Sequence, residues 1–171
     1  MNNIPEILND FNVYKDGNAL IGTTAEVSLP DFEAMTETIS GAGILGEYEV
    51  ANPGHFGAME IEIPFRILYG DIFELLDSTK AMNLTLRGSL QITDGSGSKA
   101  FKGMRVVLVG SAKQMTGGTV SAGKPMEASV TLSLTYIKIE VDGADKVELD
   151  KLNGTYKING SDVLSPIKAL C

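Results

Sequence analysis

The stretch from Val27 to Phe65 reads VSLPDFEAMTETISGAGILGEYEVANPGHFGAMEIEIPF, and it decides what kind of fold this chain adopts. Polar and apolar residues alternate along it. Met35, Glu37 and Ile39 are expected on one side of a strand, and the threonines between them on the other. Apolar residues alternate with glutamates again up to Phe65. This period of two is typical of a sheet with two different faces.

Two turn signals divide the stretch, Gly41-Ala42-Gly43 and Asn52-Pro53-Gly54. They predict a long hairpin followed by a further strand. Both arms of the hairpin are poor in apolar residues, so the hairpin has little to bury in its own domain. We therefore expect an extended hairpin that pairs with another chain, loosely ordered in the free subunit and ordered on assembly.

The flanking sequence before and just after this stretch predicts short elements. Asp16-Gly17 is typical of a tight hairpin turn, and a strand is expected from Gly22 to Leu29, where Pro30 ends it. One short helix is expected within Tyr69–Asp77. Asp71 is its predicted N-cap, and its apolar stripe is predicted to contain Ile72, Leu75 and Leu76.

From Leu84 onward the chain returns to alternating strands separated by polar loops over 94–98 and 116–125. The apolar face changes phase after Tyr136, which predicts a β-bulge or a strand that leaves one sheet to join another. Asn159-Gly160 predicts a further hairpin. We expect one mainly β domain over residues 1–171, a β-barrel or two-sheet sandwich with about ten strands and one short α-helix.

Composition narrows the function classes. The chain has 171 residues, 43% hydrophobic and 21% charged, with a formal net charge of −8. An acidic balance argues against a surface that binds nucleic acid through clustered lysine and arginine. No apolar run reaches the 18–20 residues or so of a membrane span, and the N-terminus lacks the pattern of a secretory signal. We expect cytoplasmic synthesis, no membrane anchoring and no disulfide, since Cys171 is the only cysteine.

The sequence offers little for catalysis or cofactor binding. Gly41-x-Gly43-x-x-Gly46 matches a dinucleotide fingerprint, but two glutamates and Pro53 follow where a helix is needed. His55 is the only histidine, so a zinc set or a histidine-based triad cannot form. The acidic residues over 142–150 lack the ligand order of a calcium loop. No catalytic, metal or cofactor residues are assigned, and we expect a protein that is not an enzyme.

Several segments together resemble the major tail tube protein of contractile-tailed phages and of phage-tail-like bacteriocins, and the resemblance spans nearly the whole chain. The most specific run is MTETISGAG at 35–43 with GEY at 46–48 and GHFGAM at 54–59. Weaker matches are RG at 87–88, TYIKI at 135–139, ELDKLN at 148–153 and INGSD at 158–162. Residues 166–171 differ from the usual tail of the family.

The resemblance implies a structural protein that forms hexameric rings, stacked into the hollow inner tube of a contractile tail. Its implied partners are further copies of itself, the tail sheath protein, baseplate and tail terminator proteins, and the tape measure protein in the lumen during assembly. DNA would pass without specific binding in a phage. The implied location is the virion or bacteriocin particle, assembled in the bacterial cytoplasm.

With about four strands from each of six subunits, a bore of roughly 24 strands would have a backbone circle roughly 45–50 Å across. An acidic lining would let DNA slide without sticking. Glu37, Glu47 and Glu49 are the candidates to face the lumen, with intersubunit salt bridges as the alternative role. Inter-subunit contacts are expected from Phe32, Met35, Ile39, Gly41, Gly43, Ile44, Leu45, Tyr48, His55 and Phe56.

Two other functions stay open at this point. One is a monomeric β-barrel that binds a ligand in an apolar cavity. The other is the related tube of a secretion system, whose bore carries protein effectors. The sequence does not distinguish a genome-carrying phage from a bacteriocin that pierces an envelope, because both use the same tube.

Overall fold

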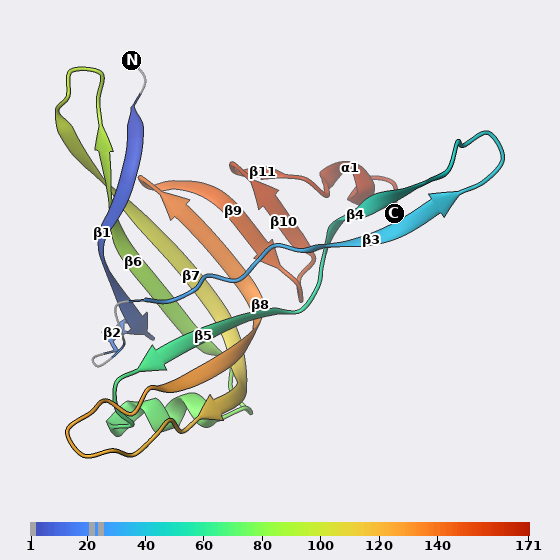
Figure 1. The fold of residues 1–171 in the computed structure, drawn as a ribbon. Coiled ribbons are helices and arrows are strands. Elements are labelled where there is room, and N and C mark those ends of the chain that lie inside the picture. The colour runs from blue at the N-terminus through green and yellow to red at the C-terminus, as the bar shows by residue number, and fades with distance from the viewer. Residues whose placement is uncertain (1–2, 21–22, 24–25) are drawn as a thin grey trace.

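The computed structural model describes residues 3–20, 23 and 26–171, and in them the chain is mainly β, as predicted (Figure 1). Every strand pair is antiparallel. The strands are β1 (Ile4–Lys15), β2 (Asn18–Ala19), β3 (Ala34–Ser40), β4 (Glu47–Phe56), β5 (Met59–Phe65), β6 (Met82–Thr93), β7 (Lys99–Thr116), β8 (Ala128–Val141), β9 (Ala144–Asp150), β10 (Thr155–Ile158) and β11 (Ser161–Asp162). The helices are η1 (Gly70–Leu76) and α1 (Ser165–Lys168).

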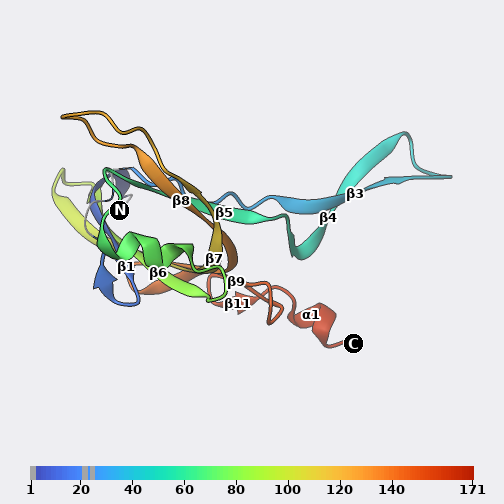
Figure 2. The same ribbon diagram turned by 90° about the horizontal axis from the view of Figure 1, so that it is seen from below.

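One large sheet builds the body of the molecule. Its strand order is β11-β10-β9-β8-β7-β6-β1-β2, and β5 pairs with β8 outside this path. The sheet folds over itself, so that β5 and β8 form one layer and β1 and β6 form the other (Figure 2). The result is broadly a β-sandwich. Among the described residues the strands do not close into a barrel, so the barrel alternative is not realised.

β8 serves both layers because it bends. Its first half, Ala128–Leu134, pairs with β5, and its second half, from Tyr136 onward, pairs with β9. The register with β7 shifts at the same place, between Val109 and Gly110, which confirms the bulge predicted from the phase change. Gly110 is required there, because a Cβ on it would lie 2.3 Å from the Ser133 carbonyl oxygen.

The core lies between the layers and follows the alternation of the sequence. Apolar residues of β5 and the first half of β8 meet those of β6 and β7, and the most deeply buried include Ile63, Phe65, Leu84, Val106 and Val130. The glutamates of β5 lie on the opposite face. No helix in the described part of the chain is long and apolar enough to cross a membrane.

The predicted helix is present but differs in type and cap. It is a 3-10 helix that begins at Gly70, so Asp71 lies inside it, and its N-cap is Tyr69, without a capping side-chain hydrogen bond. With three residues per turn, positions i and i+3 share a face. Ile72 and Leu75 are therefore buried, whereas Leu76, predicted to face the sheet, is 40% exposed.

The strand predicted over 22–29 is also wrong in its described part. Thr23 makes one isolated bridge with Phe65, and residues 26–29 have no regular pairing. The rest of that prediction lies outside the described residues. The predicted turns at Asp16-Gly17 and Asn159-Gly160 are confirmed, since Asp16 and Asn159 have positive φ values of 48° and 49°.

Candidate assembly surface

The hairpin β3–β4 projects from the body as an arm (Figure 1). We use the name arm for residues 34–56. Its two strands pair only with each other, in a sheet separate from the main one. An isolated two-stranded hairpin is marginally stable in water, so the arm has the form of an element that is completed by contact with something else.

The register of the arm gives it two different faces. Residues directly opposite in an antiparallel pair share a face. Glu37 lies opposite Val50, and Ile39 opposite Tyr48. With Met35 these residues form the apolar arm face, and its apolar members are 36–57% exposed. The polar arm face carries Thr36, Thr38, Ser40, Glu47 and Glu49.

The three carboxylates predicted to line a lumen are therefore divided between the two faces. Glu47 and Glu49 share the polar arm face, whereas Glu37 lies among apolar side chains on the other. All three side chains are exposed. Side chains on the two faces of the arm point in opposite directions, and which of them faces a lumen stays a prediction. Alternation along each strand was visible in the sequence, but the register between the strands was not.

The tip of the arm holds four of the predicted contact residues. Gly41 and Gly43 lie in the turn, and Gly43 has a φ of 90°, which favours glycine. Ile44 and Leu45 follow, and the Leu45 side chain is fully exposed. The Gly41-x-Gly43-x-x-Gly46 pattern thus forms a hairpin turn with a strand after it. A pyrophosphate-binding turn would need a helix N-terminus there.

The base of the arm is packed against its own chain. The Phe56 ring contacts the Phe32 ring at 5.9 Å and the Tyr156 ring of β10 at 5.1 Å, both edge to face. His55 is exposed beside this cluster. Phe32 and Phe56 were predicted to contact another subunit, and the structure places them in this intramolecular cluster, with Phe32 still 37% exposed.

Two further contacts tie the arm to the last part of the chain. Lys151 Nζ donates a hydrogen bond to the Gly57 carbonyl oxygen, and partial burial lowers the pKa of Lys151. The Leu164 side chain lies directly against Gly54, where an added Cβ would come within 2.7 Å of it. These contacts fix the direction in which the arm leaves the body.

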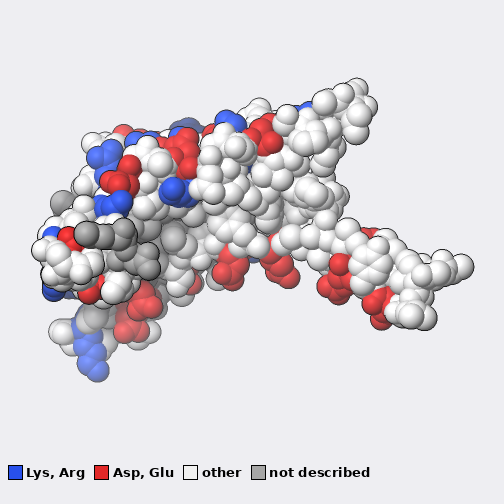
Figure 3. Space-filling model, turned by 90° about the horizontal axis from the view of Figure 1, so that it is seen from above, with Lys and Arg blue, Asp and Glu red and all other residues white. Residues whose placement is uncertain are grey.

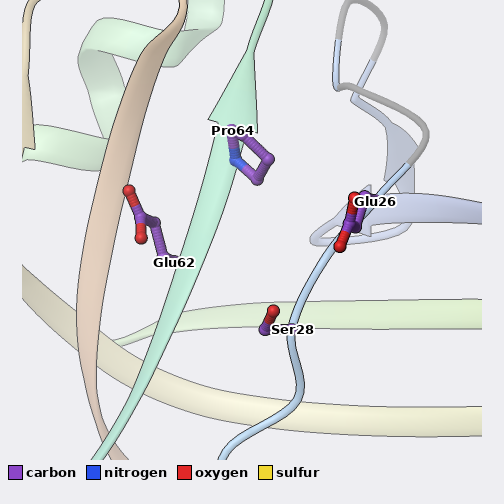
Figure 4. A pocket seen from close by; sticks show the side chains of 4 residues that line it. All are labelled: Glu26, Ser28, Glu62 and Pro64. Atoms are coloured by element: carbon purple, nitrogen blue, oxygen red, sulfur yellow. The ribbon is translucent and has the colours of Figure 1, made fainter.

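One edge of β5 has no regular neighbour in the described residues. Residues 26–33 run along it and are held by the Thr23–Phe65 bridge and by a hydrogen bond from Gly57 N to the Glu33 carbonyl oxygen. Between them lies an open pocket of about 320 Å³, lined by Glu26, Ser28, Glu62 and Pro64 (Figure 4). Two carboxylates at its mouth make it a poor site for an anionic ligand.

Charge is strongly segregated along the chain. From Asp16 to Phe65 the sequence contains nine carboxylates and no lysine or arginine. Figure 3 shows acidic side chains of both the body and the arm along the same lower edge of the view. Only some of them are neutralised: Lys113 pairs with Glu60, whereas Glu47 and Glu49 make no ion pair with a described residue. This edge is therefore a negatively charged surface.

Sequence reasoning missed a second exposed apolar surface, at the end of the body away from the arm. We call it the basal patch and define it as Arg66, Ile67, Tyr69, Phe73 and Lys124. Its apolar members are 50–78% exposed. A hydrogen bond from Met126 N to the Arg66 carbonyl oxygen joins the β7–β8 loop to the segment before η1. Ile67 and Tyr69 lie just after β5, outside the alternating pattern of the strand. Periodicity therefore gave no signal that they are exposed.

The described residues contain no group of three or more histidine, cysteine or acidic side chains placed to hold a metal ion. The strongest perturbation of a titratable group is at Tyr136, whose pKa is raised to about 12 by burial and by the neighbouring Glu148 carboxylate. Tyr136 donates a hydrogen bond to Glu148, which also pairs with Lys157. This network joins β8, β9 and β10 of the main sheet.

Comparison with known proteins gives the family. The family model described as phage tail tube protein FII matches residues 5–170. The chain is 29% identical to the "Tail tube protein" of Escherichia phage P2 over 168 residues, which cover 94% of each chain. It is 28% identical to the "Major tail tube protein" of Serratia phage KSP20, covering 94% of this chain and 91% of the relative. The resemblance seen in the sequence is thereby confirmed, and the chain belongs to the phage tail tube protein FII family.

Proposed function

We propose that this protein forms hexameric rings that stack into the hollow inner tube of a contractile tail. The observation that carries the proposal is the arm, a two-faced hairpin that leaves its apolar face outside the core of its own chain. Exposed apolar patches of this kind mark protein interfaces. Phage tail tube proteins are structural components of the virion, and the tube gives this surface a partner, namely another copy of the chain.

The strand arrangement supports a wall built from several strands of each copy. β4 leads into β5 with Gly57 and Ala58 between them, β5 pairs with β8, and β8 pairs with β7. β3 pairs with β4 in the separate arm sheet, so each copy has about four strands that it could contribute to a tube wall. Six copies would supply roughly 24 strands, and the backbone circle would be roughly 45–50 Å across, wide enough for an open channel.

In this tube Glu47 and Glu49 line the bore together with Glu62 of β5. Glu62 lies on the face of β5 opposite the core and is exposed. A negative bore repels phosphate and leaves no binding minima along the path, so DNA slides through it. The partner proposed for the outside of the tube is the tail sheath protein. The baseplate and tail terminator proteins are proposed for its ends, and the tape measure protein for its lumen during assembly.

The alternatives are less well supported. A monomeric ligand-binding barrel requires a closed sheet, which the described residues do not form. A secretion-system tube would carry proteins through the same type of bore. The match to phage tail tube proteins over residues 5–170 favours a tail. Bacteriocin and phage tails remain equally compatible with this subunit.

Negative-stain electron microscopy of the purified protein tests the proposal. We expect hollow tubes at high protein concentration, with sixfold symmetry in end-on averages and sedimentation far above that of the 18.2 kDa chain. A protein that stays monomeric at all concentrations, in the presence and absence of a short preformed tail tube as a seed, would refute it.

A further inference from the structure

Glu37 occupies an unusual place on the arm. It is the only charged residue on the apolar arm face, where Met35 and Ile39 flank it along the strand and Val50 lies opposite. It makes no ion pair with a described residue. Glu47 and Glu49, by contrast, share a face with threonine and serine. The sequence therefore places one carboxylate inside the surface that assembly would bury.

A carboxylate buried in an apolar contact must meet a cation, because removing an unpaired charge from water is costly. The arm cannot supply one, since no lysine or arginine occurs between Asp16 and Phe65. The partner surface must therefore combine exposed apolar side chains with an unpaired cation. Such a pair also fixes the register of the contact, because like charges facing each other are strongly disfavoured.

The basal patch combines these two properties. Ile67, Tyr69 and Phe73 are 50%, 78% and 52% exposed. Arg66 and Lys124 are exposed, and neither makes an ion pair with a described residue. Glu127, on the same loop as Lys124, reduces the positive charge of the patch without cancelling it. Most other cations of the body are already paired, as in Lys102–Asp142 and Arg105–Glu140.

The arm and the basal patch lie at opposite ends of the molecule. In Figure 1 the arm extends to the upper right, whereas η1 and the β7–β8 loop lie at the lower left, and Figure 2 keeps the same separation. Two complementary surfaces at opposite ends cannot satisfy each other in one subunit. A contact between them would join two copies head to tail and could continue from subunit to subunit.

We infer that the apolar arm face of one copy docks on the basal patch of a second copy, where Glu37 pairs with Arg66. The guanidinium of arginine is suited to this role, because it binds a carboxylate with two parallel hydrogen bonds and is weakly hydrated. Glu37 is thereby an interface residue, and Glu47 and Glu49 are left for the bore. This inference rests on the proposed self-assembly and names the surface that receives the arm.

A charge swap tests the pairing. Glu37→Arg and Arg66→Glu should each raise the protein concentration needed for tube formation on the order of tenfold or more. The double variant, Glu37→Arg with Arg66→Glu, should return it close to the wild-type value. Tubes are measured by sedimentation and electron microscopy, and circular dichroism with thermal unfolding verifies that each variant is folded.

Two matched controls keep the test specific. Lys146→Glu makes the same charge change as Arg66→Glu at an exposed lysine of β9 that makes no ion pair with a described residue, and Glu33→Arg matches Glu37→Arg at an exposed carboxylate outside the arm. Both should assemble like the wild type.

The outcomes separate this inference from the proposed function. Single variants that assemble like the wild type, equal losses in the controls, or a swap that does not restore assembly would each overturn the pairing and leave the tube intact. Lys99, at the start of β7, is another exposed lysine that makes no ion pair with a described residue, and rescue of Glu37→Arg by Lys99→Glu in place of Arg66→Glu would also overturn the pairing. A wild type that never forms tubes would overturn both.

Discussion

The substitution Ile39→Asp separates assembly from folding. Ile39 lies on the apolar arm face and is 36% exposed. Its backbone pairs with β4 of the arm and not with a strand of the main sheet. Exposed substitutions away from the core usually change the free energy of unfolding by about 0.5 kcal/mol or less. We therefore expect the thermal unfolding of the unassembled variant to remain close to that of the wild type.

Assembly should respond much more strongly. Fully burying an exposed isoleucine side chain contributes about 1.5–3 kcal/mol, and because Ile39 is 36% exposed, burying the rest of it contributes about 0.5–1 kcal/mol. Loss of this term alone raises the critical concentration for tubes about two- to sixfold, since each 1.4 kcal/mol is about tenfold in an equilibrium constant. An aspartate buried beside Glu37 adds a desolvation penalty and repulsion to that loss. The assay is the supernatant concentration after sedimentation of tubes, measured over a range of total protein.

Thr36→Asp is the matched control for Ile39→Asp. It adds the same charge to the same strand on the polar arm face, opposite Ala51, and should assemble near the wild-type concentration. Leu132 is 1% exposed, so Leu132→Ala serves as a control that damages the core and not the assembly surface. It should lower the free energy of unfolding by about 2–5 kcal/mol. The reasoning is refuted if Ile39→Asp forms tubes at the wild-type concentration, or if Thr36→Asp loses assembly to the same degree.

Three further predictions follow from the same contacts. Gly54→Ala should lower thermal stability, because Gly54 has a φ of 76° and the new Cβ would contact Leu164; an unchanged melting temperature would contradict this. The raised pKa of Tyr136 means that the unfolded state loses this proton first, so stability present below pH 10 declines between pH 10 and about pH 12. Tyr136→Phe should reduce that decline in urea unfolding measured at pH 8 and pH 11, and equal declines would exclude the Tyr136–Glu148 pair as its cause. In hydrogen exchange, amides of residues 36–50 should gain protection on tube formation, and equal protection before and after would show that the arm is ordered without a partner.

The body of the fold could be predicted because its signals are local. Alternation of apolar residues gave the buried faces of β5, β6 and β8, and the phase change after Tyr136 gave the bulge where β8 passes from β5 to β9. Glycine-containing turns at 16–17, 41–43 and 159–160 marked hairpins, because few other residues adopt their backbone angles. The turn predicted at Asn52-Pro53-Gly54 is wrong, since these residues lie within β4. These features depend on residues that are neighbours in sequence.

The errors occurred where distant contacts or helix type decide the structure. Residues 26–29 looked like a strand, but they are held beside β5 by contacts at the two ends of the segment. The helix near Asp71 has the composition of an α-helix and is a 3-10 helix, which changes the face on which Leu76 lies. Local sequence propensity explains neither the lack of strand pairing at residues 26–29 nor the 3-10 form of the helix.

The candidate site was predictable only in part, for the same reason. Alternation identified the residues of each arm strand that share a face, but the pairing of β3 with β4 decides that Glu37 lies with Val50, and Glu49 with Thr38. The turn between them could have shifted that register by one residue without a visible change in the pattern. Such a shift would exchange the two faces of β4.

The orientation of the arm depends on the end of the chain. Phe56 packs on Tyr156, Gly54 contacts Leu164, and Gly57 accepts a hydrogen bond from Lys151, which is 94 residues further along. These contacts can form only when β9 and β10 have folded against β8. Until then the arm strands can pair with each other, but their apolar face has no fixed direction. A fixed direction is what a head-to-tail contact needs, because a contact made at a variable angle cannot repeat from copy to copy. The last strands therefore act on assembly indirectly, by holding the base of the arm.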